Sequence, residues 1–323
     1  MMVRSKDSSN TFHTILLILA MAVLAGFVGY LLGGKFGLFA AVVLTLFGLV
    51  AGSRASAAIV LRMYKAQPIH PQQAPQLFAI YNELCRRAQL SPYPKLYYIP
   101  TRMPNAFAVG MGKSSAVALT DGIIRMMNPR ELAGILAHEI THVQYRDTSV
   151  LGVADIISRT ISALSRVGLL MIFLSAGSLF GNSAISFWAT GAILFFSPTV
   201  AVMLQLALSR TREFNADHGA AELTGDAHGL ASALKKLDRM AQNQGGVLGK
   251  IMRPGMKRQQ PAMLRTHPPT EDRIAALMEI AQELESRRPL PDEVLPSDRR
   301  IVPVDRPRVR QKPRYRIVSG LWR

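Results

Sequence analysis

The sequence predicts a mainly helical, polytopic membrane protein that carries a small β-sheet. Two observations lead to this fold class. First, the chain of 323 residues is apolar, with a mean hydropathy of +0.17 and 18% charged residues. Second, uncharged runs of 21, 18 and 42 residues occupy positions 14–34, 36–53 and 167–208. Because about 20 apolar residues cross a bilayer as a helix, these runs have room for about four transmembrane helices.

The first two runs predict a transmembrane hairpin. A cleaved signal peptide is the alternative for residues 14–34, but this run is longer than a typical signal core and a second run follows it almost at once. Only Lys35 lies between the two runs, whereas basic residues flank their outer ends. The flanking residues are Arg4, Lys6, Arg54, Arg62 and Lys65. By the positive-inside rule, both ends of the hairpin and the segment that follows it face the cytoplasm.

The third run is long enough for a second hairpin with a break near residues 181–183. Residues 184–208 form a good span. The segment before the break is weaker, because filling a bilayer with it takes in Arg166. For this segment, a tilted or partly interfacial placement is the alternative to a full crossing.

The segments outside the apolar runs have short elements of both kinds. Residues 95–99, 106–109 and 116–119 are rich in β-formers and lie between turn residues, which predicts a small sheet closed by residues 120–122. Helical periodicity predicts helices at 76–88, 209–223 and 271–287. A further helix is expected to start at Pro129, with a buried apolar stripe at helical spacing formed by Leu132, Ile135, Leu136, Ile140 and Val143. Residues 244–265 are expected to form a mobile loop.

The net charge of +17 is concentrated at the end of the chain. Residues 299–323 contain nine Arg or Lys and one Asp, with three prolines between them, and are expected to be disordered. In a membrane-anchored chain, this tail attracts anionic lipid headgroups or is simply solvated, and no nucleic acid is expected. The single cysteine, Cys85, excludes an internal disulfide and has no assigned role.

The most specific motif is His138-Glu139-Ile140-Thr141-His142. Asn128, Pro129 and Glu131 give the start signal of a helix, so the motif is expected to be helical. Two imidazoles four residues apart on one helical face can bind the same zinc ion. Glu139 lies one step round the helix, where it can take a proton from a water on that zinc.

A catalytic zinc needs a third protein ligand. Glu213 and Asp217 lie at i and i+4 on one predicted helical face, so Glu213 is the candidate ligand and Asp217 the candidate partner of a ligand histidine. These residues can meet His138 and His142 only if the run at 167–208 crosses the membrane an even number of times. Asp147 is interpreted as a structural carboxylate rather than a ligand.

Several motifs together resemble the HtpX-type membrane zinc metalloproteases, relatives of the CaaX prenyl endoproteases. The matching motifs are residues 105–108, 115–118, 138–147, 212–217 and 266–269 with 273–274. The resemblance covers about residues 12–285. It implies a zincin-like domain on the cytoplasmic face, one Zn²⁺ per chain, and a place in the bacterial inner membrane. Its implied function is quality control, with damaged membrane proteins or unfolded polypeptides as substrates.

The resemblance also implies roles for individual residues. His138, His142 and Glu213 match the zinc ligands, Glu139 the general base, and Asp217 the partner of a ligand histidine. His267 matches a histidine that stabilises the oxyanion. Asn105, Ala106, Phe107 and Ala108 match an edge strand that pairs with an extended substrate.

The predicted organisation therefore has five parts. They are an N-terminal hairpin (1–65), a first part of the metalloprotease domain (66–166), a second hairpin (167–208), a second part of that domain (209–298) and a basic tail (299–323). Two alternative functions stay open. One is processing of a specific partner, as the prenyl endoproteases do, and the other is a membrane-tethered chaperone with a structural zinc. An intact Glu139 argues against the second, because a structural site needs no base.

Overall fold

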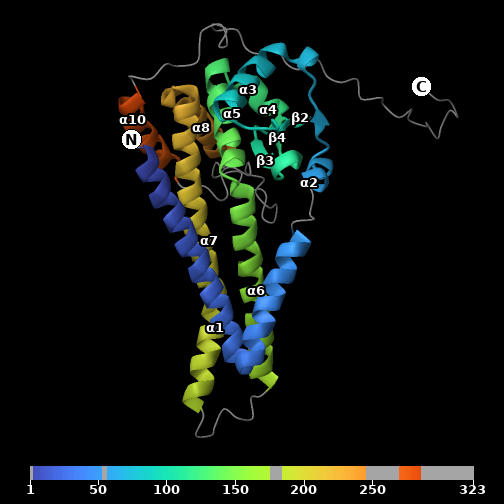
Figure 1. The fold of residues 1–323 in the computed structure, drawn as a ribbon, viewed down its shortest axis with the longest axis vertical. Helices are drawn as coiled ribbons and strands as arrows, with labels where there is room; N and C mark the ends of the chain where they lie inside the picture. Colours follow the sequence, from blue (N-terminus) through green and yellow to red (C-terminus); the bar gives the residue numbers. More distant parts are fainter. Residues whose placement is uncertain (1–2, 53–56, 175–183, 245–268, 285–323) are drawn as a thin grey trace, which may run out of the picture.

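The structure, a computed structural model, describes residues 3–52, 57–174, 184–244 and 269–284. Three long helices extend from a compact assembly of shorter helices and a four-stranded sheet (Figure 1). The mainly helical fold with a small sheet confirms that part of the predicted fold class. The predicted break at 181–183, the loop beyond residue 244 and the basic tail lie outside the described residues.

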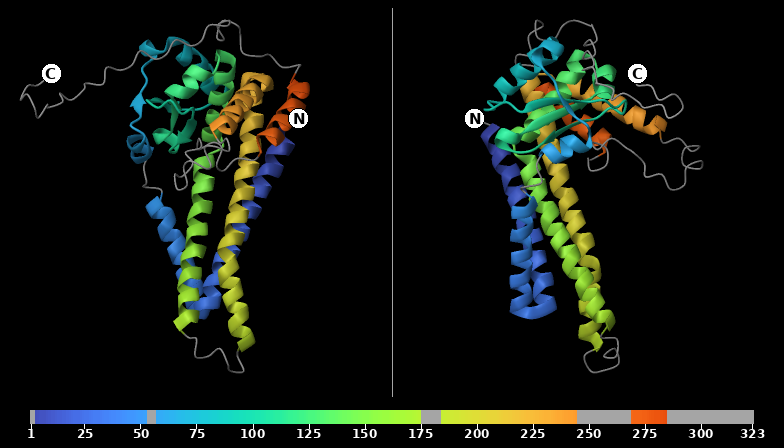
Figure 2. Two further views of the ribbon diagram at one scale, coloured as in Figure 1. Left: turned by 180° about the vertical axis from the view of Figure 1, so that it is seen from behind. Right: turned by 90° about the vertical axis from the view of Figure 1, so that its right-hand side faces the viewer.

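The long helices are α1 (Val3–Gly52), α6 (Asp147–Leu174) and α7 (Ala184–Thr224), and together they form a region that we call the stalk. Each contains a segment long and apolar enough to cross a membrane: Phe12–Gly48, Asp147–Phe173 and Trp188–Thr224. Helix α1 is broken at Gly33 and Gly34, where Gly34 has a φ of +56°. Its two arms lie side by side and run antiparallel (Figure 2). The first predicted hairpin is therefore present as one bent helix.

The helices of the second hairpin differ from the prediction. Helix α6 begins at Asp147 rather than near residue 167, and α7 continues without a break through the helix predicted at 209–223. The predicted boundaries at 166 and 208 therefore fall inside helices. The uncharged-run criterion failed because α6 carries charged residues that do not interrupt the helix: Arg159 pairs with Asp155 at 2.7 Å, and Arg166 donates to the Ser162 carbonyl.

The shorter elements form a region that we call the head, which contains one mixed sheet. Its strands are β1 (Gln67–Pro68), β2 (Lys95–Ile99), β3 (Ala106–Val109) and β4 (Ala116–Thr120), in the order β1-β2-β4-β3. Strands β2 and β4 are parallel, and the outer pairs are antiparallel. The three predicted strands are present, and the two-residue β1, which contains Pro68, was not predicted. Strand β3 is at an edge of the sheet.

The helices of the head are α2 (Ala57–Met63), α3 (Pro75–Arg87), α4 (Asp121–Met126), α5 (Pro129–Gln144), α8 (Ala227–Gln244) and α10 (Thr270–Leu284). Thr120 caps α4, so the predicted closing turn is a helix start. Helix α5 lies at the centre and packs against α3, α7, α8 and β3. Its predicted apolar stripe is buried, with Leu132, Ile135, Leu136 and Ile140 at 0% exposure.

The start of α5 is fixed by the capping box that the sequence predicts. The Asn128 side chain accepts from the Glu131 N–H at 2.8 Å, and the Glu131 carboxylate accepts from the Asn128 N–H at 3.0 Å. The same carboxylate accepts from Ser232 at 2.7 Å and Lys236 at 2.6 Å on α8. Burial raises the pKa of Glu131, but the bonds from Lys236 and Ser232 outweigh it, so its pKa lies below the ordinary value of 4.5.

The Glu131 carboxylate should therefore contribute to stability in a pH-dependent way. Because its folded pKa is lowered, the contribution is complete above pH 4.5 and is lost as the pH falls through the folded pKa. Glu131→Gln should cost about 1 kcal/mol at neutral pH, less than a fully buried charged hydrogen bond, since the Lys236 side chain is 41% exposed. Thermal unfolding in detergent between pH 7 and about pH 3 measures this. Glu283→Gln, at an exposed position of α10, is the control. If the thermal stability of Glu131→Gln falls with decreasing pH as steeply as that of wild type, the expectation is wrong.

Candidate metal centre

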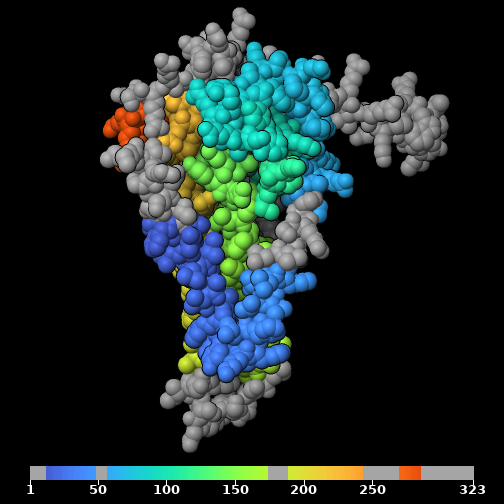
Figure 3. All heavy atoms as spheres, in the orientation of Figure 1, coloured from blue at the N-terminus to red at the C-terminus, as the bar shows by residue number. Residues whose placement is uncertain are grey.

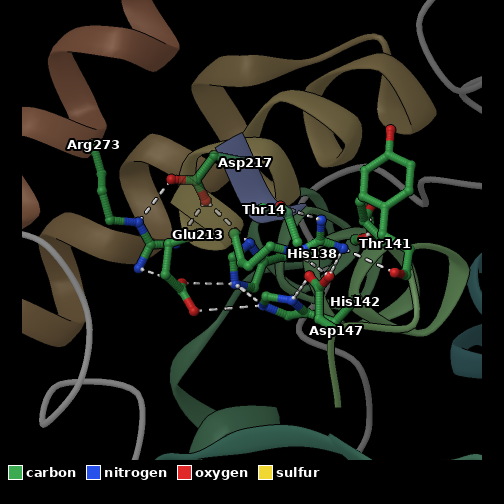
Figure 4. Close-up of polar contacts among 11 residues, drawn as sticks. Thr14, His138, Thr141, His142, Asp147, Glu213, Asp217 and Arg273 are labelled. Atoms are coloured by element: carbon green, nitrogen blue, oxygen red, sulfur yellow. Dashed lines mark hydrogen bonds and ion pairs between the residues drawn. The ribbon is translucent and has the colours of Figure 1, made fainter. Parts of the chain in front are cut away.

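Helices α5 and α7 bring three candidate ligands to one point (Figure 4). His138 and His142 project from one face of α5, and Glu213 faces them from α7. One ligand atom from each lies within 4.8 Å of the other two. His138 and Glu213 are buried and His142 is half-buried, so the cluster lies mostly inside the protein, with His142 as its most exposed member.

The distances within this cluster suit a tetrahedral zinc ion. The Nε2 atoms of His138 and His142 are 3.1 Å apart. Glu213 Oε2 lies 3.4 Å from His138 Nε2, and Oε1 lies 3.7 Å from His142 Nε2. Ligand atoms about 2.0–2.2 Å from zinc in tetrahedral directions stand about 3.3–3.6 Å from each other. The three residues therefore fit a zinc site with a fourth position left for water or substrate.

A buried carboxylate–arginine pair lies behind His138. Its Nδ1 atom is 3.0 Å from Asp217 Oδ1, although the alignment falls short of a hydrogen bond. Arg273 of α10 donates two hydrogen bonds to Asp217, at 2.6 and 2.7 Å, and approaches Glu213 at 3.5 Å. Asp217 thus lies where it can fix the His138 ring, and Arg273 compensates the buried charge.

A second pair of the same kind lies behind His142. Its Nδ1 atom is 2.6 Å from Asp147 Oδ2. Arg146, with a left-handed φ of 54°, interrupts the helix between α5 and α6, and Asp147 begins α6 next to the ligand. Arg212 of α7 bonds to Asp147 and donates to the Tyr145 carbonyl at 2.8 Å. Each ligand histidine therefore has its own carboxylate, and each carboxylate its own arginine.

The electrostatic environment of the cluster favours a cation between the ligands. Burial lowers the pKa of His138, but Asp217 and Glu213 outweigh this effect and raise the pKa to about 10. Burial likewise lowers the pKa of Arg273, and the nearby Asp217 outweighs this and raises it. A site that holds a proton this firmly also attracts a divalent ion to the same nitrogen and carboxylate atoms.

The other predicted site residues lie around this cluster. Glu139 follows His138 on α5 and is 3% exposed. Strand β3, with Ala106, Phe107 and Ala108, packs against α5, which places the edge strand beside the ligand helix. Asn105 precedes the strand, and its side-chain oxygen is buried without a hydrogen bond to any described residue. His267 lies outside the described residues, so its role stays a prediction.

The sequence analysis missed the orienting role of Asp147 and the roles of both arginines. Asp147 was interpreted as a structural carboxylate, and Arg212 and Arg273 were noted only as members of the matching motifs. A signal was present, because a buried carboxylate beside a ligand requires a counter-charge. Nothing in the spacing, however, showed which arginine would supply it. Arg212 is 65 positions from Asp147, and Arg273 is 56 positions from Asp217.

Fold and site together define a membrane metalloprotease of the His-Glu-x-x-His class. The sequence profile of Peptidase family M48 matches residues 71–281. The chain belongs to this family. The matches confirm the resemblance to HtpX-type proteases that the motifs predicted.

Named relatives agree with this assignment. The chain is 36% identical over 283 residues to a Protease HtpX homolog of Ralstonia pickettii (strain 12J), which covers 84% of this chain and 97% of the relative. It is 37% identical over 285 residues to a Protease HtpX homolog of Salinibacter ruber, covering 84% and 98%. The crystal structure of S. mikatae Ste24p is similar with a TM-score of 0.46 and 19% identity, covering 86% of this chain and 66% of that one.

The carboxylate behind His142 should be needed for tight metal binding. Asp147→Asn removes the charge that orients the ring, and such changes typically weaken metal affinity by about 10- to 100-fold. Chelator competition on the detergent-purified protein, with zinc content as the readout, measures the loss. Asp155→Asn on the same helix is the matched control, because the partner of Asp155 among the described residues is the exposed Arg159. Equal zinc affinity in the two variants would show that Asp147 does not support the ligand.

Proposed function

We propose that this protein is a zinc-dependent endopeptidase of the bacterial inner membrane. It cleaves membrane proteins or unfolded polypeptides on the cytoplasmic face, and its role is quality control. The observation that carries the proposal is the geometry of His138, His142 and Glu213, with the carboxylate of Glu139 buried beside it. The names of the relatives support a protease of this type.

The chemistry divides between the metal and the chain. When bound, zinc would supply Lewis acidity that polarises the scissile carbonyl and makes a water more acidic. Glu139 then takes the proton of the attacking water and returns it to the leaving amine. Asp217 and Asp147 keep the ligand rings in one orientation throughout. His267 is proposed to donate to the developing oxyanion.

The edge strand β3 is the proposed substrate-binding element. Among the described residues, only β4 pairs with β3, so the backbone groups on its other side can pair with an extended peptide. An added strand would lie alongside α5, the helix that carries Glu139. The buried side-chain oxygen of Asn105 is an acceptor suited to a substrate N–H at the start of this strand.

The proposed topology has four crossings. The bent helix α1 supplies two arms, and α6 and α7 supply two more. The ligands on α5 and α7 lie before and after the α6–α7 hairpin, so this hairpin returns the chain to the side it left. The basic residues around the outer ends of α1 favour the cytoplasm for that side. The five-part division of the chain stays part of this proposal.

The catalytic role of Glu139 has a direct test. Glu139→Gln should keep a normal zinc content, since the ligands are unchanged, and lose casein cleavage by about 100- to 10,000-fold, the range for a general acid–base group. Glu283→Gln is again the surface control. Cleavage by Glu139→Gln at the wild-type rate would refute the mechanism. Zinc-loaded wild type that binds polypeptides but never cuts them would favour the chaperone alternative.

The proposed orientation is tested by labelling in cells. Gln72, which is exposed in the head, is replaced by Cys, and the native Cys85 is buried and should not react. A membrane-impermeant maleimide should label Gln72→Cys only after the cells are lysed. Labelling of intact spheroplasts to the same extent would place the head on the other side of the membrane.

A further inference from the structure

Helix α2 has two apolar faces, although it is only seven residues long. One face is buried: Leu61 packs with Ile99, Ala116 and Ala118 against the sheet. At the end of the helix, the ring of Tyr64 lies 5.2 Å from the ring of Phe107 on β3. This side of α2 therefore holds the proposed substrate strand.

The other face of α2 is left uncovered by the described residues. Ile59 and Met63, one turn apart, are 53% and 77% exposed. The loop between β3 and β4 continues this surface with Met111, which is 46% exposed. Helix and loop are in contact, since a Cβ added to Gly110 would lie 3.0 Å from that of Ala57. Large apolar side chains gathered in this way mark a binding surface.

The depth of this surface relative to a bilayer follows from its contact with α6. The Ser149 hydroxyl, on the third residue of α6, contacts the Met111 sulfur. The apolar span of α6 has 27 residues. At about 1.5 Å per residue it is about 40 Å long, which exceeds the hydrocarbon core of about 30 Å and equals a bilayer with its headgroups. Ser149 is therefore at headgroup level, and so is the loop that it contacts.

The views of the molecule agree with this level. Helix α2 lies at the end of the head nearest the stalk, beside the upper end of the second arm of α1 (Figure 1). The space-filling view shows α2 on the outer surface of the head at its lower margin (Figure 3). Helix α2 therefore lies on the side of the head that faces the stalk.

The charged residues on the two segments that form this surface are all basic. Arg62, Lys65 and Lys113 are exposed, and the chain has no Asp or Glu between residues 8 and 82 or between residues 84 and 120. Basic residues that surround apolar side chains suit an anionic headgroup layer, where long side chains keep their charge in water. Tyr64 is of the type enriched at that depth.

We propose that α2 and the β3–β4 loop form a membrane-docking surface that lies in the headgroup layer of an anionic bilayer. Ile59, Met63 and Met111 enter the lipid, and Arg62, Lys65 and Lys113 contact phosphate. If the proposed function holds, this surface keeps β3 at the bilayer, so peptide segments that reach β3 are those adjacent to a transmembrane helix.

The test measures depth rather than cleavage and is made in the full-length Glu139→Gln protein, so its outcome is separate from that of the proposed function. A spin label at Met63→Cys is compared with two reference labels. One is at Phe47→Cys on the stalk, where Phe47 is 72% exposed, and the other is at the exposed Gln72→Cys in the head. The proteoliposomes contain phosphatidylglycerol. Collision with oxygen and with a water-soluble nickel complex reports the depth of each label.

The label at residue 63 should resemble the one at Phe47 in its preference for oxygen. Replacing Arg62 and Lys65 with Gln should shift the equilibrium from lipid to water by about fivefold per charge. A label at residue 63 that is as accessible to nickel as the one at Gln72 would overturn the proposal. So would dipolar broadening between labels on two chains, which would assign the surface to a second copy of the protein.

Discussion

The site depends on one constraint: a carboxylate buried beside a metal ligand requires a cation within contact distance. Asp217 and Arg273 meet this constraint for His138, and Asp147 and Arg212 meet it for His142. Breaking such a pair leaves a buried charge uncompensated, at a cost of about 3–5 kcal/mol. The four residues come from α6, α7 and α10, so the pairs also fix these helices against α5. Metal geometry and helix packing thus rest on the same contacts.

The ligand helix is held along its whole length. Helix α5 starts at a capping box, buries an apolar stripe and presents both histidines from a different face. Gly134 allows α8 to approach, since a Cβ there would lie 2.8 Å from the Leu230 nitrogen. With the helix held at its start, its side and its end, the two imidazoles have little freedom before any metal binds.

Local signals predicted much of this arrangement from the sequence. The cap at Asn128, the stripe from Leu132 to Ile140 and the spacing of His138 and His142 all depend on neighbours within one or two helical turns. The three strands followed from composition and turn residues in the same way. Glu213 was found through a different argument, because a catalytic site needs a third ligand and the membrane limits where it can come from.

The rest depends on contacts between distant segments, which spacing does not encode. The start of α6 was misplaced because charged residues interrupt an uncharged run without ending the helix. The partners of Asp147 and Asp217 come from residues 65 and 56 positions away, respectively. Arg212 reaches further still: its guanidinium contacts the hydroxyl of Thr14 at 3.5 Å, on the first arm of α1. The first arm of α1 therefore reaches the buried charge pair behind His142. The stalk and the metal centre are joined by a direct side-chain contact, so a change in how the first arm lies would be felt at Arg212.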